Sequence, residues 1–214
     1  MTYPGSLFII SAASGAGKTS LVQSIVKQIG NIELSVSYTT RNKRPNEKHG
    51  VDYFFVTKEI FLEMQTKGNF LESAQVFDNY YATSKNVVQS ILADGKDVIL
   101  EIDWQGAAQI RNQLSNLHIN NKPIQGISVF ILPPSLKVLS DRLMARGQDS
   151  LEIIQKRLNT AQKETEHYID YDYLIINDNF NHAIQDLIAI IKAQRLTVAR
   201  QKVVHASLIN SLLV

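Results

Sequence analysis

The sequence Ser11-Ala12-Ala13-Ser14-Gly15-Ala16-Gly17-Lys18-Thr19 lies near the start of the chain. Residues 7–10 before it form a short apolar run, and residues 21–29 after it place apolar side chains at helical spacing. A strand, a glycine-containing loop and a helix in this order are typical of a phosphate-binding loop. Its glycines let backbone N–H groups close around phosphate oxygens, its lysine reaches the β- and γ-phosphates, and its hydroxyl holds Mg²⁺. We therefore predict a nucleotide-binding loop formed by Ala12, Ala13, Ser14, Gly15, Ala16, Gly17, Lys18 and Thr19.

Ala12 departs from the usual pattern of such a loop, G-x-x-x-x-G-K-[ST], which has a glycine at this position. A residue with a side chain needs an ordinary backbone conformation, so we expect that Ala12 is not left-handed. The part of the loop that wraps phosphate should then begin at Ser14 and Gly15. A helix N-terminus with a surface lysine is the alternative interpretation of the same residues.

The composition is typical of an ordinary soluble globular chain. Its 214 residues are 44% hydrophobic and 20% charged, enough for one domain with appendages or for two small domains. A net charge of +2 does not indicate nucleic acid as a general partner. The absence of cysteine excludes disulfides, thiolate catalysis and cysteine-ligated zinc, and the five histidines show no paired ligand spacing. With no basic leader and no apolar run of membrane-spanning length, we expect a cytoplasmic enzyme without a membrane partner.

Four buried strands separated by helices predict an α/β fold with a parallel sheet. The candidate strands are residues 6–11, 97–103, 126–132 and 173–177. Residues 32–83 have a different texture, with alternating or aromatic runs at 32–38 and 53–56 and a loop rich in Arg, Lys, Pro and Gly. We expect this segment to be an inserted subdomain built on a mixed sheet.

Residues 135–168 predict a second insertion, a helical lid made of two helices joined by a glycine turn. Ser135 is the expected N-cap of the first helix, which runs through Arg146 and stops at Gly147. Asp149 and Glu152 resemble a capping box for the second helix. The remaining segments then form a discontinuous core, at residues 1–31, 84–134 and 169–214.

Residues 39–53 form a loop that combines two arginines with a tyrosine. Arg41 and Arg44 lie three residues apart, and Tyr53 follows Gly50. A guanidinium group can bind a phosphate through two hydrogen bonds, and a tyrosine hydroxyl can add another donor. The loop is therefore a candidate for a second phosphate site, and a solvated basic loop is the alternative.

This loop, Thr39-Thr40-Arg41-x-x-Arg44-x-x-Glu47-x-x-Gly50-x-x-Tyr53-x-Phe55, resembles the signature of the guanylate kinase family. The resemblance continues over nearly the whole chain, through Asn79-Tyr80-Tyr81, Glu101-Ile102-Asp103-Trp104-Gln105-Gly106 and Arg146-Gly147-Gln148-Asp149-Ser150. It implies a P-loop NTPase-type core with an inserted GMP-binding subdomain and a lid. It also implies ATP and GMP as substrates, Mg²⁺ as cofactor, and transfer of the γ-phosphoryl group of ATP to GMP.

The resemblance also implies a role for each residue of the acceptor site. Guanine presents N1–H and a 2-amino group as adjacent donors, so a pocket that selects it needs a carboxylate, and the family places that carboxylate at Glu72. Ser37 and Thr83 then meet the edge of the base, and Asp103 contacts the acceptor nucleotide. The implied phosphate-binding residues are Arg41, Arg44, Tyr53 and Tyr81.

Glu101 and Asp103 stand two residues apart at the carboxyl end of a buried strand, where ligands of open α/β sheets bind. Carboxylates in such a place are costly to bury unless they serve a cation or a ligand. By the resemblance, Thr19 binds Mg²⁺, partly through water, and Glu101 lies near the metal and its waters. Capping of the following loop is the alternative role for Glu101.

The first lid helix carries Arg142 and Arg146 four residues apart, so both lie on one face. Like charges so placed repel each other mildly, and an anion between them removes the conflict. The family uses lid arginines on the ATP phosphates, and Arg157 joins them by resemblance. Solvation aided by Asp141 is the alternative. The expected catalytic residues are Lys18, Arg41, Arg142, Arg146 and Arg157.

Three other functions compete with this interpretation. Residues 103–106 satisfy the D-x-x-G of a GTPase switch, but Ile124 stands where an N-K-x-D motif beginning at Asn121 requires aspartate. A guanylate-kinase-like protein-binding module is expected to lose the donor site, whereas Lys18 and Thr19 are present. A related kinase with another phosphorylated acceptor is disfavoured by the predicted guanine pocket.

The C-terminal segment, beyond a long predicted helix, is apolar along one face. Its leucines and isoleucine recur at helical spacing, at Leu208, Ile209, Leu212 and Leu213. We expect this segment to pack either on the core or on another subunit of a homo-oligomer.

Overall fold

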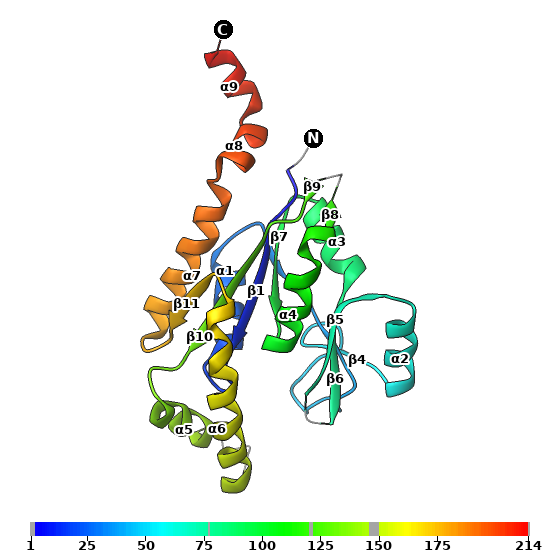
Figure 1. Ribbon diagram of the computed structural model, residues 1–214, viewed down its shortest axis with the longest axis vertical. Helices are drawn as coiled ribbons and strands as arrows, with labels where there is room; N and C mark the ends of the chain where they lie inside the picture. Colours follow the sequence, from blue (N-terminus) through cyan, green and yellow to red (C-terminus); the bar gives the residue numbers. More distant parts are fainter. Residues whose placement is uncertain (1–2, 77, 120–121, 146–149, 214) are drawn as a thin grey trace.

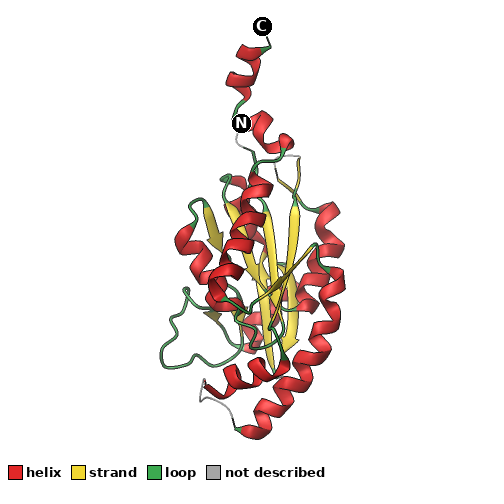
Figure 2. Ribbon diagram, turned by 90° about the vertical axis from the view of Figure 1, so that its left-hand side faces the viewer, coloured by secondary structure: helices red, strands yellow, loops and turns green. Residues whose placement is uncertain are grey.

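A five-stranded parallel sheet forms the centre of the computed structural model, which describes residues 3–76, 78–119, 122–145 and 150–213. The strand order is β11-β10-β1-β7-β2, and every neighbouring pair is parallel. Helices lie on both sides of this sheet (Figures 1 and 2), which confirms the predicted α/β fold. The strands are β1 Leu7–Ala12, β2 Ile32–Leu34, β7 Asp97–Glu101, β10 Gly126–Leu132 and β11 Tyr173–Ile176.

Alternate side chains of β1 enter two separate hydrophobic cores, because successive strand residues point to opposite faces. Phe8 and Ile10 pack in the cluster that includes residues of α1 and α7. Leu7 and Ile9 pack in the other cluster, with residues of α3 and α4. Burial on both faces explains why the strand reads as a continuous apolar run. The four helices are α1 Lys18–Gln28, α3 Lys85–Ala93, α4 Trp104–Gln113 and α7 Phe180–Arg195.

All four strands predicted for the parallel sheet are present, with ends that differ from the expected ones by at most two residues. The run at residues 32–38, expected wholly in the insertion, divides instead. Its first part is β2, which pairs with β7 as a fifth core strand, and its last residue begins β3 (Tyr38–Thr39) of a second sheet. The expected boundary at residue 32 is too early, because pairing with a distant strand decides where β2 belongs.

The second sheet is mixed, as predicted for the insertion. Its order is β4-β3-β6-β5, in which β3 and β4 are parallel and the other two pairs are antiparallel. Helix α2 (Lys58–Thr66) begins after its N-cap Thr57 and buries Phe61 completely. The ring of Phe61 packs 4.9 Å from that of Phe70 and 5.5 Å from that of Tyr80, measured between centroids. The other strands are β4 Phe54–Phe55, β5 Phe70–Val76 and β6 Asn79–Ser84.

The helix pair α5 (Leu136–Ala145) and α6 (Leu151–Thr165) projects beyond the carboxyl end of the parallel sheet (Figure 1). Ser135 accepts a hydrogen bond from the N–H of Val138, which fits its predicted role as an N-cap. The capping box expected at Asp149 is wrong, because α6 begins after Ser150, whose hydroxyl accepts from the N–H of Ile153. A hydroxyl directly before the helix meets the free N–H groups better than a side chain one residue earlier. Arg146, Gly147 and Asp149 lie outside the described residues.

Short elements complete the chain. They are a two-stranded sheet of β8 (His118–Ile119) and β9 (Lys122–Pro123), two 3-10 turns, and two C-terminal helices. The turns are η1 Leu114–Asn116 and η2 Glu166–Asp170, and the helices are α8 Val198–Val204 and α9 Ala206–Leu212. Helix α9 projects away from the body of the molecule (Figure 1). Among the described residues, no helix is long and apolar enough to cross a membrane.

Asp97, at the start of β7, fastens the C-terminal helices to the core. Its side chain is fully buried and accepts from Arg195 Nε at 2.7 Å, from Arg200 Nη1 at 2.8 Å and from the N–H of Ser6 at 2.8 Å. Because a buried charge is tolerated only when it is paired and hydrogen-bonded, the two arginines and Asp97 depend on one another. This cluster holds α7 and α8 at the end of the sheet opposite to the loop at residues 12–19.

Candidate active site

The phosphate-binding loop connects β1 to α1 with left-handed backbone at two glycines. Gly15 has φ 93° and Gly17 has φ 98°, and a Cβ at Gly17 would lie 2.6 Å from Asn177 Nδ2. Ala12 is the last residue of β1, and Asn31 is the one non-glycine residue with positive φ in the described part of the chain. The expectation that Ala12 avoids the left-handed region is confirmed, so the departure from the usual glycine causes no backbone strain.

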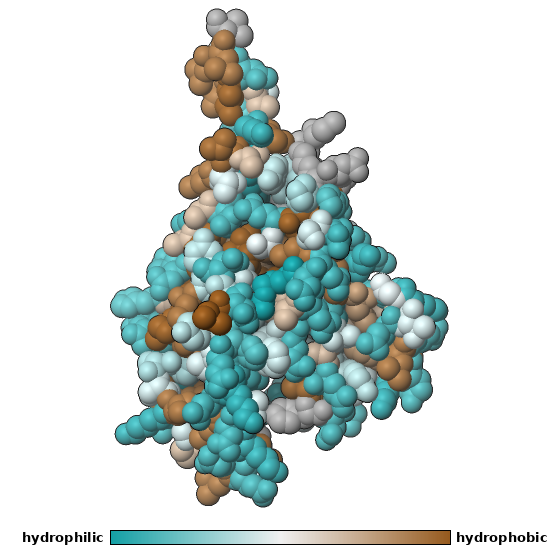
Figure 3. All heavy atoms as spheres, viewed as in Figure 1, coloured by the Kyte–Doolittle hydropathy of each residue, from teal (hydrophilic) through white to brown (hydrophobic). Residues whose placement is uncertain are grey.

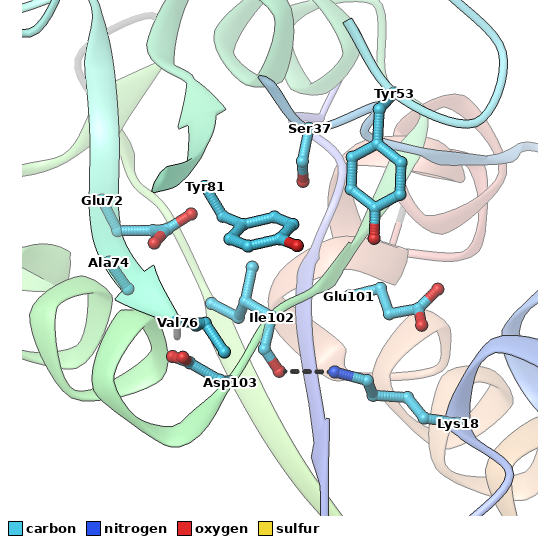
Figure 4. Close-up of a pocket in the computed structure, with 10 residues that line it drawn as sticks. All are labelled: Lys18, Ser37, Tyr53, Glu72, Ala74, Val76, Tyr81, Glu101, Ile102 and Asp103. Carbon is cyan, nitrogen blue, oxygen red and sulfur yellow. Dashed lines mark hydrogen bonds between the residues drawn. The ribbon is translucent and has the colours of Figure 1, made fainter. Parts of the chain in front are cut away.

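The start of α1 and the end of β7 meet at the carboxyl edge of the sheet. Lys18 Nζ donates to the carbonyl oxygen of Ile102 at 2.9 Å (Figure 4). The hydroxyl of Thr19 donates to Oε1 of Glu101. These two contacts bring the lysine and the hydroxyl at the start of α1 together with the carboxylate at the end of β7.

A cavity of about 220 Å³ lies between the parallel sheet and the mixed sheet (Figure 4). Glu72 lies at one end of it, and Lys18 and Glu101 lie at the other. The hydroxyls of Tyr53 and Tyr81 point toward the Lys18 end. One cavity therefore joins the phosphate loop to a buried carboxylate. The residues that line it are Lys18, Ser37, Tyr53, Glu72, Ala74, Val76, Tyr81, Glu101, Ile102 and Asp103.

Glu72 is a buried carboxylate held by the pairing of β5 with β6. The register places it opposite Thr83, whose hydroxyl donates to Glu72 Oε1 at 2.7 Å. Burial raises the pKa of Glu72 to about 7, and the hydrogen bond from Thr83 works in the opposite direction. Thr83 is itself fully buried behind Glu72 and does not line the cavity. The carboxylate is thus presented to the cavity by a residue that fixes its orientation.

Gly106 makes room for Glu72 on the opposite side. A Cβ at this position would lie 2.6 Å from Glu72 Oε2 and 3.0 Å from its carboxyl carbon. Position 106 therefore requires glycine, because any larger side chain would push the carboxylate out of place.

Arg41 is held by Glu47 through two parallel hydrogen bonds. Nη1 donates to Oε2 at 3.1 Å and Nη2 donates to Oε1 at 2.8 Å. The hydrogen bond from Arg41 lowers the pKa of Glu47, and the backbone N–H of Arg44 also donates to this carboxylate at 2.8 Å. The guanidinium lies 5.5 Å from the ring centroid of Tyr53. The side chain of Arg44 is exposed, and neither arginine lines the cavity described above.

Asp103 follows β7 and is the N-cap of α4. Its Oδ1 accepts from the N–H of Gly106 at 2.8 Å, while its side chain also lines the cavity. The capping role weighed for Glu101 therefore belongs to Asp103, because β7 ends at Glu101 and the helix begins at Trp104. Glu101 instead accepts the hydrogen bond from Thr19.

The lid approaches the phosphate loop from two sides. Arg142 of α5 donates to the carbonyl oxygen of Asn177 at 2.9 Å and to that of Ala16, in the phosphate loop, at 3.4 Å. Arg142 and Asn177 line a cavity of about 510 Å³ beside this loop. Arg157 of α6 lines a separate cavity of about 320 Å³ between the lid and the start of α4. The predicted partner of Arg142 on the same helix face, Arg146, lies outside the described residues.

Three residues of this region are not among the site residues predicted from the sequence. Asn177 donates from Nδ2 to the carbonyl oxygen of Ala16 at 2.7 Å, and Phe180 lines the 510 Å³ cavity beside it. Glu164 of α6 accepts from the N–H of Ser14 at 2.9 Å. Asn177 follows a parallel strand at its carboxyl end, a position that indicates ligand contact in such sheets. Glu164 stands two helical turns after Arg157, so the spacing alone places both on one face.

Comparison with known proteins decides the family. The sequence model of the family described as guanylate kinase matches residues 5–194. The chain belongs to the guanylate kinase family.

The similarities to known proteins extend over nearly the full length of this chain. Guanylate kinase of Pseudoalteromonas translucida (strain TAC 125) is 51% identical over 98% of this chain and 97% of its own length. Guanylate kinase of Escherichia coli (strain K12) is 50% identical over 98% of both chains. The crystal structure of guanylate kinase from Anaplasma phagocytophilum superposes with a TM-score of 0.75 at 30% identity, covering 93% of this chain and 90% of that one. These findings confirm the predicted family, fold class and enzyme class.

The structure brings most of the predicted site residues together. Ser37, Tyr53, Glu72, Tyr81 and Asp103 surround one cavity with Lys18. A second cavity of about 220 Å³ is lined by residues 12–19 together with Asp103 and Glu164. Lys18 and Asp103 line both cavities, and they therefore mark the point where the two predicted nucleotide sites meet.

Proposed function

We propose that this chain transfers the γ-phosphoryl group of ATP to GMP, with GMP in the cavity between the two sheets and ATP on the loop at residues 12–19. The observation that carries the proposal is the continuous cavity that leads from the buried Glu72 carboxylate to Lys18. A base recognised at one end of this cavity directs its 5′-phosphate toward the loop lysine at the other.

Recognition of guanine rests on Glu72. Its carboxylate offers two acceptor oxygens, and guanine presents two adjacent donors, N1–H and the 2-amino group. Thr83 orients the carboxylate from behind, and Ser37 lines the cavity as a further polar group. Adenine lacks this donor pair, so it would leave Oε2 of the buried carboxylate without a donor, and discrimination can reach about 10⁴–10⁵ in sites of this kind.

Binding of the GMP phosphate falls to Arg41, Arg44, Tyr53 and Tyr81. Arg41 is oriented by Glu47, and its guanidinium can exchange one of those hydrogen bonds for a phosphate oxygen. Arg44 is exposed at the same loop, so it joins the phosphate when the loop folds over the acceptor. The hydroxyls of Tyr53 and Tyr81 already point toward the end of the cavity that holds Lys18.

Binding of ATP falls to the loop and the lid. Backbone N–H groups of residues 12–19 bind the β- and γ-phosphates, and Lys18 leaves the Ile102 carbonyl to donate to them. Arg142, Arg146 and Arg157 neutralise charge that develops during in-line attack by a GMP phosphate oxygen. That oxygen is already ionised near neutral pH, so positioning and charge neutralisation suffice and no general base is needed. The 510 Å³ cavity beside Gly15 and Gly17 is placed to receive the base of ATP.

Mg²⁺ fits the oxygen groups beside the loop. The Thr19 hydroxyl and the Glu101 carboxylate lie together, and hard cations prefer such ligands. In the described residues, no group of three or more His, Asp or Glu side chains could hold a metal ion. Phosphate oxygens and water would complete the ligand set of Mg²⁺. When bound, Mg²⁺ supplies neutralisation of the β- and γ-phosphates. Thr19 would hold it, partly through water, and Glu101 would contact the water bound to it.

Assays with different acceptors test the proposed activity. Initial rates of ADP formation from ATP are measured with GMP, AMP, UMP and CMP under identical conditions. We expect rapid turnover with GMP and rates at least about 10³-fold lower with AMP, because of the unpaired carboxylate. Faster turnover with any other acceptor would establish the alternative of a related kinase. A lack of turnover with all four would support the binding-module alternative.

We also propose that the C-terminal segment mediates self-association. Helix α9 has only seven residues, and helices shorter than about 12 residues are marginal in water without a packing surface. Hydrophobic side chains gather on the projecting C-terminal end of the molecule (Figure 3), where Leu208, Leu212 and Leu213 are all more than half exposed. A second copy of this segment is therefore the occupant that we propose for this face. Light scattering at several concentrations tests the proposal, and a monomer at every concentration would contradict it. The predictions of a cytoplasmic location and of no nucleic-acid or membrane partner stay predictions.

A further inference from the structure

Glu164 links the lid to the phosphate loop through one hydrogen bond. It lies in the last turn of α6, and its Oε2 accepts from the backbone N–H of Ser14 at 2.9 Å. The side chain lines both the loop cavity and the 320 Å³ cavity under the lid. A residue 150 positions away in the chain therefore reaches the loop that is proposed to bind the donor phosphates.

The Glu164 carboxylate makes the kind of contact that a phosphate oxygen makes with such a loop. Backbone N–H groups at the start of a helix attract anions, and a carboxylate and a phosphate compete for them. Lys18 adds attraction at the same place, whereas Asp103 repels. Burial raises the pKa of Glu164, so holding its charge there is costly. The hydrogen bond between the Ser14 N–H and the Glu164 carboxylate therefore forms despite the cost of removing that carboxylate from water.

We propose that Glu164 is an internal competitor for the donor site: its carboxylate occupies the Ser14 amide until the phosphates of the donor nucleotide displace it. The proposal rests on the proposed donor role of residues 12–19. A polyphosphate and the Glu164 carboxylate cannot both accept from the Ser14 N–H at this distance, and their negative charges repel each other. Donor affinity is therefore lowered by the free energy of the Glu164 contact.

Displacement of Glu164 also couples donor binding to the position of the lid. Glu164 and Arg157 are seven residues apart on α6, and both line the cavity under the lid. When Glu164 leaves the loop, Arg157 on the same face of α6 can approach the donor phosphates in its place. Trp104 stacks on His167 with ring centroids 3.7 Å apart, so a shift of this end of the lid also changes the surroundings of the single tryptophan.

Calorimetric titration with inorganic tripolyphosphate tests the proposal on the full chain. Tripolyphosphate is the probe because it occupies the loop without needing the base cavity. The variant Glu164→Gln keeps the shape of the side chain but removes its charge. We expect this variant to bind tripolyphosphate about tenfold more tightly than the wild type, since a hydrogen bond to a charged acceptor is replaced by a weaker neutral one. The matched control Glu166→Gln removes an exposed carboxylate two residues away and should bind as the wild type does.

Two measurements keep the outcomes distinct. GMP is titrated into each variant, and unchanged GMP affinity shows that the fold and the acceptor site are intact. Equal or weaker tripolyphosphate binding by Glu164→Gln, with intact GMP binding, would overturn the proposal while leaving the donor role of the loop in place. A lack of tripolyphosphate binding by the wild type and both variants would overturn the donor role itself, and the proposal with it. The variant Glu164→Ala, which removes the acceptor entirely, should bind at least as tightly as Glu164→Gln.

Discussion

Substitution of Glu72 by Gln changes the atom that the guanine pocket presents without changing its size. Glu72 is 5% exposed, and one of its oxygens already accepts from Thr83. In the variant, the remaining position facing the base carries an NH₂ group for part of the time, so a donor meets the donors of guanine. A hydrogen bond to a charged group contributes about 1.5–3 kcal/mol, and an unpaired buried donor costs about 1–3 kcal/mol.

We expect a total loss of about 2–4 kcal/mol in GMP binding, which corresponds to about 30- to 1,000-fold in affinity. ATP affinity should change less than about threefold, because Glu72 lies at the end of the cavity away from Lys18. Calorimetric titration of GMP and of ATP into the wild type and the variant measures both. Glu63→Gln is the matched control, since Glu63 is an exposed carboxylate of the same subdomain. Equal losses for GMP and ATP, or no loss of GMP affinity, would refute the assignment of Glu72 to the guanine base.

The remaining predictions concern stability and the supports of the site. Because burial raises the pKa of Glu72 to about 7 from 4.5, the folded state holds this proton more tightly, and the free energy of unfolding should fall as pH rises from about 4.5 to 7. Denaturant unfolding at several pH values should show that the difference between wild type and Glu72→Gln changes over this window; a constant difference would contradict the raised pKa. Gly106→Ala should weaken GMP binding about tenfold, or ~1.4 kcal/mol, and leave ATP binding intact, because its Cβ displaces Glu72; unchanged GMP affinity in the same titration would show that the carboxylate moves at no cost. Asp97→Asn should lower the free energy of unfolding by about 3–5 kcal/mol, because it leaves Arg200 buried without a charged partner, whereas Asp94→Asn at an exposed position should have little effect. A urea titration that gives the same loss for both variants would contradict the anchoring role of Asp97.

Local patterns in the sequence were sufficient for the parallel sheet. The strand predicted at residues 126–132 has the observed ends, because its apolar run is buried on both faces, begins after Gly126 and stops before Pro133. The phosphate loop is equally predictable from the sequence, since its glycines, lysine and hydroxyl act within nine consecutive residues. These features depend on neighbours in the chain.

Features that depend on contacts between distant segments of the chain cannot be predicted from local sequence patterns. The run at 32–38 divided between two sheets because β2 pairs with β7, and nothing within the run reveals that partner. Asp103 rather than Glu101 caps α4, because the strand ends two residues earlier than expected. The contact of Glu164 with Ser14 spans the lid and the core, so only their relative placement reveals it. The orientation of Glu72 by Thr83 likewise follows from the register of β5 and β6.

We propose that a phosphoryl group passes directly from a donor on residues 12–19 to an acceptor whose base is bound at Glu72. The most direct test of this transfer is to incubate the enzyme with GMP and with ATP labelled in the γ-phosphate, and to follow the label. We expect the label to appear in the β-phosphate of GDP, at the same rate as ADP forms. Label that appears in inorganic phosphate, or ADP that forms equally fast without GMP, would contradict direct transfer between the two sites.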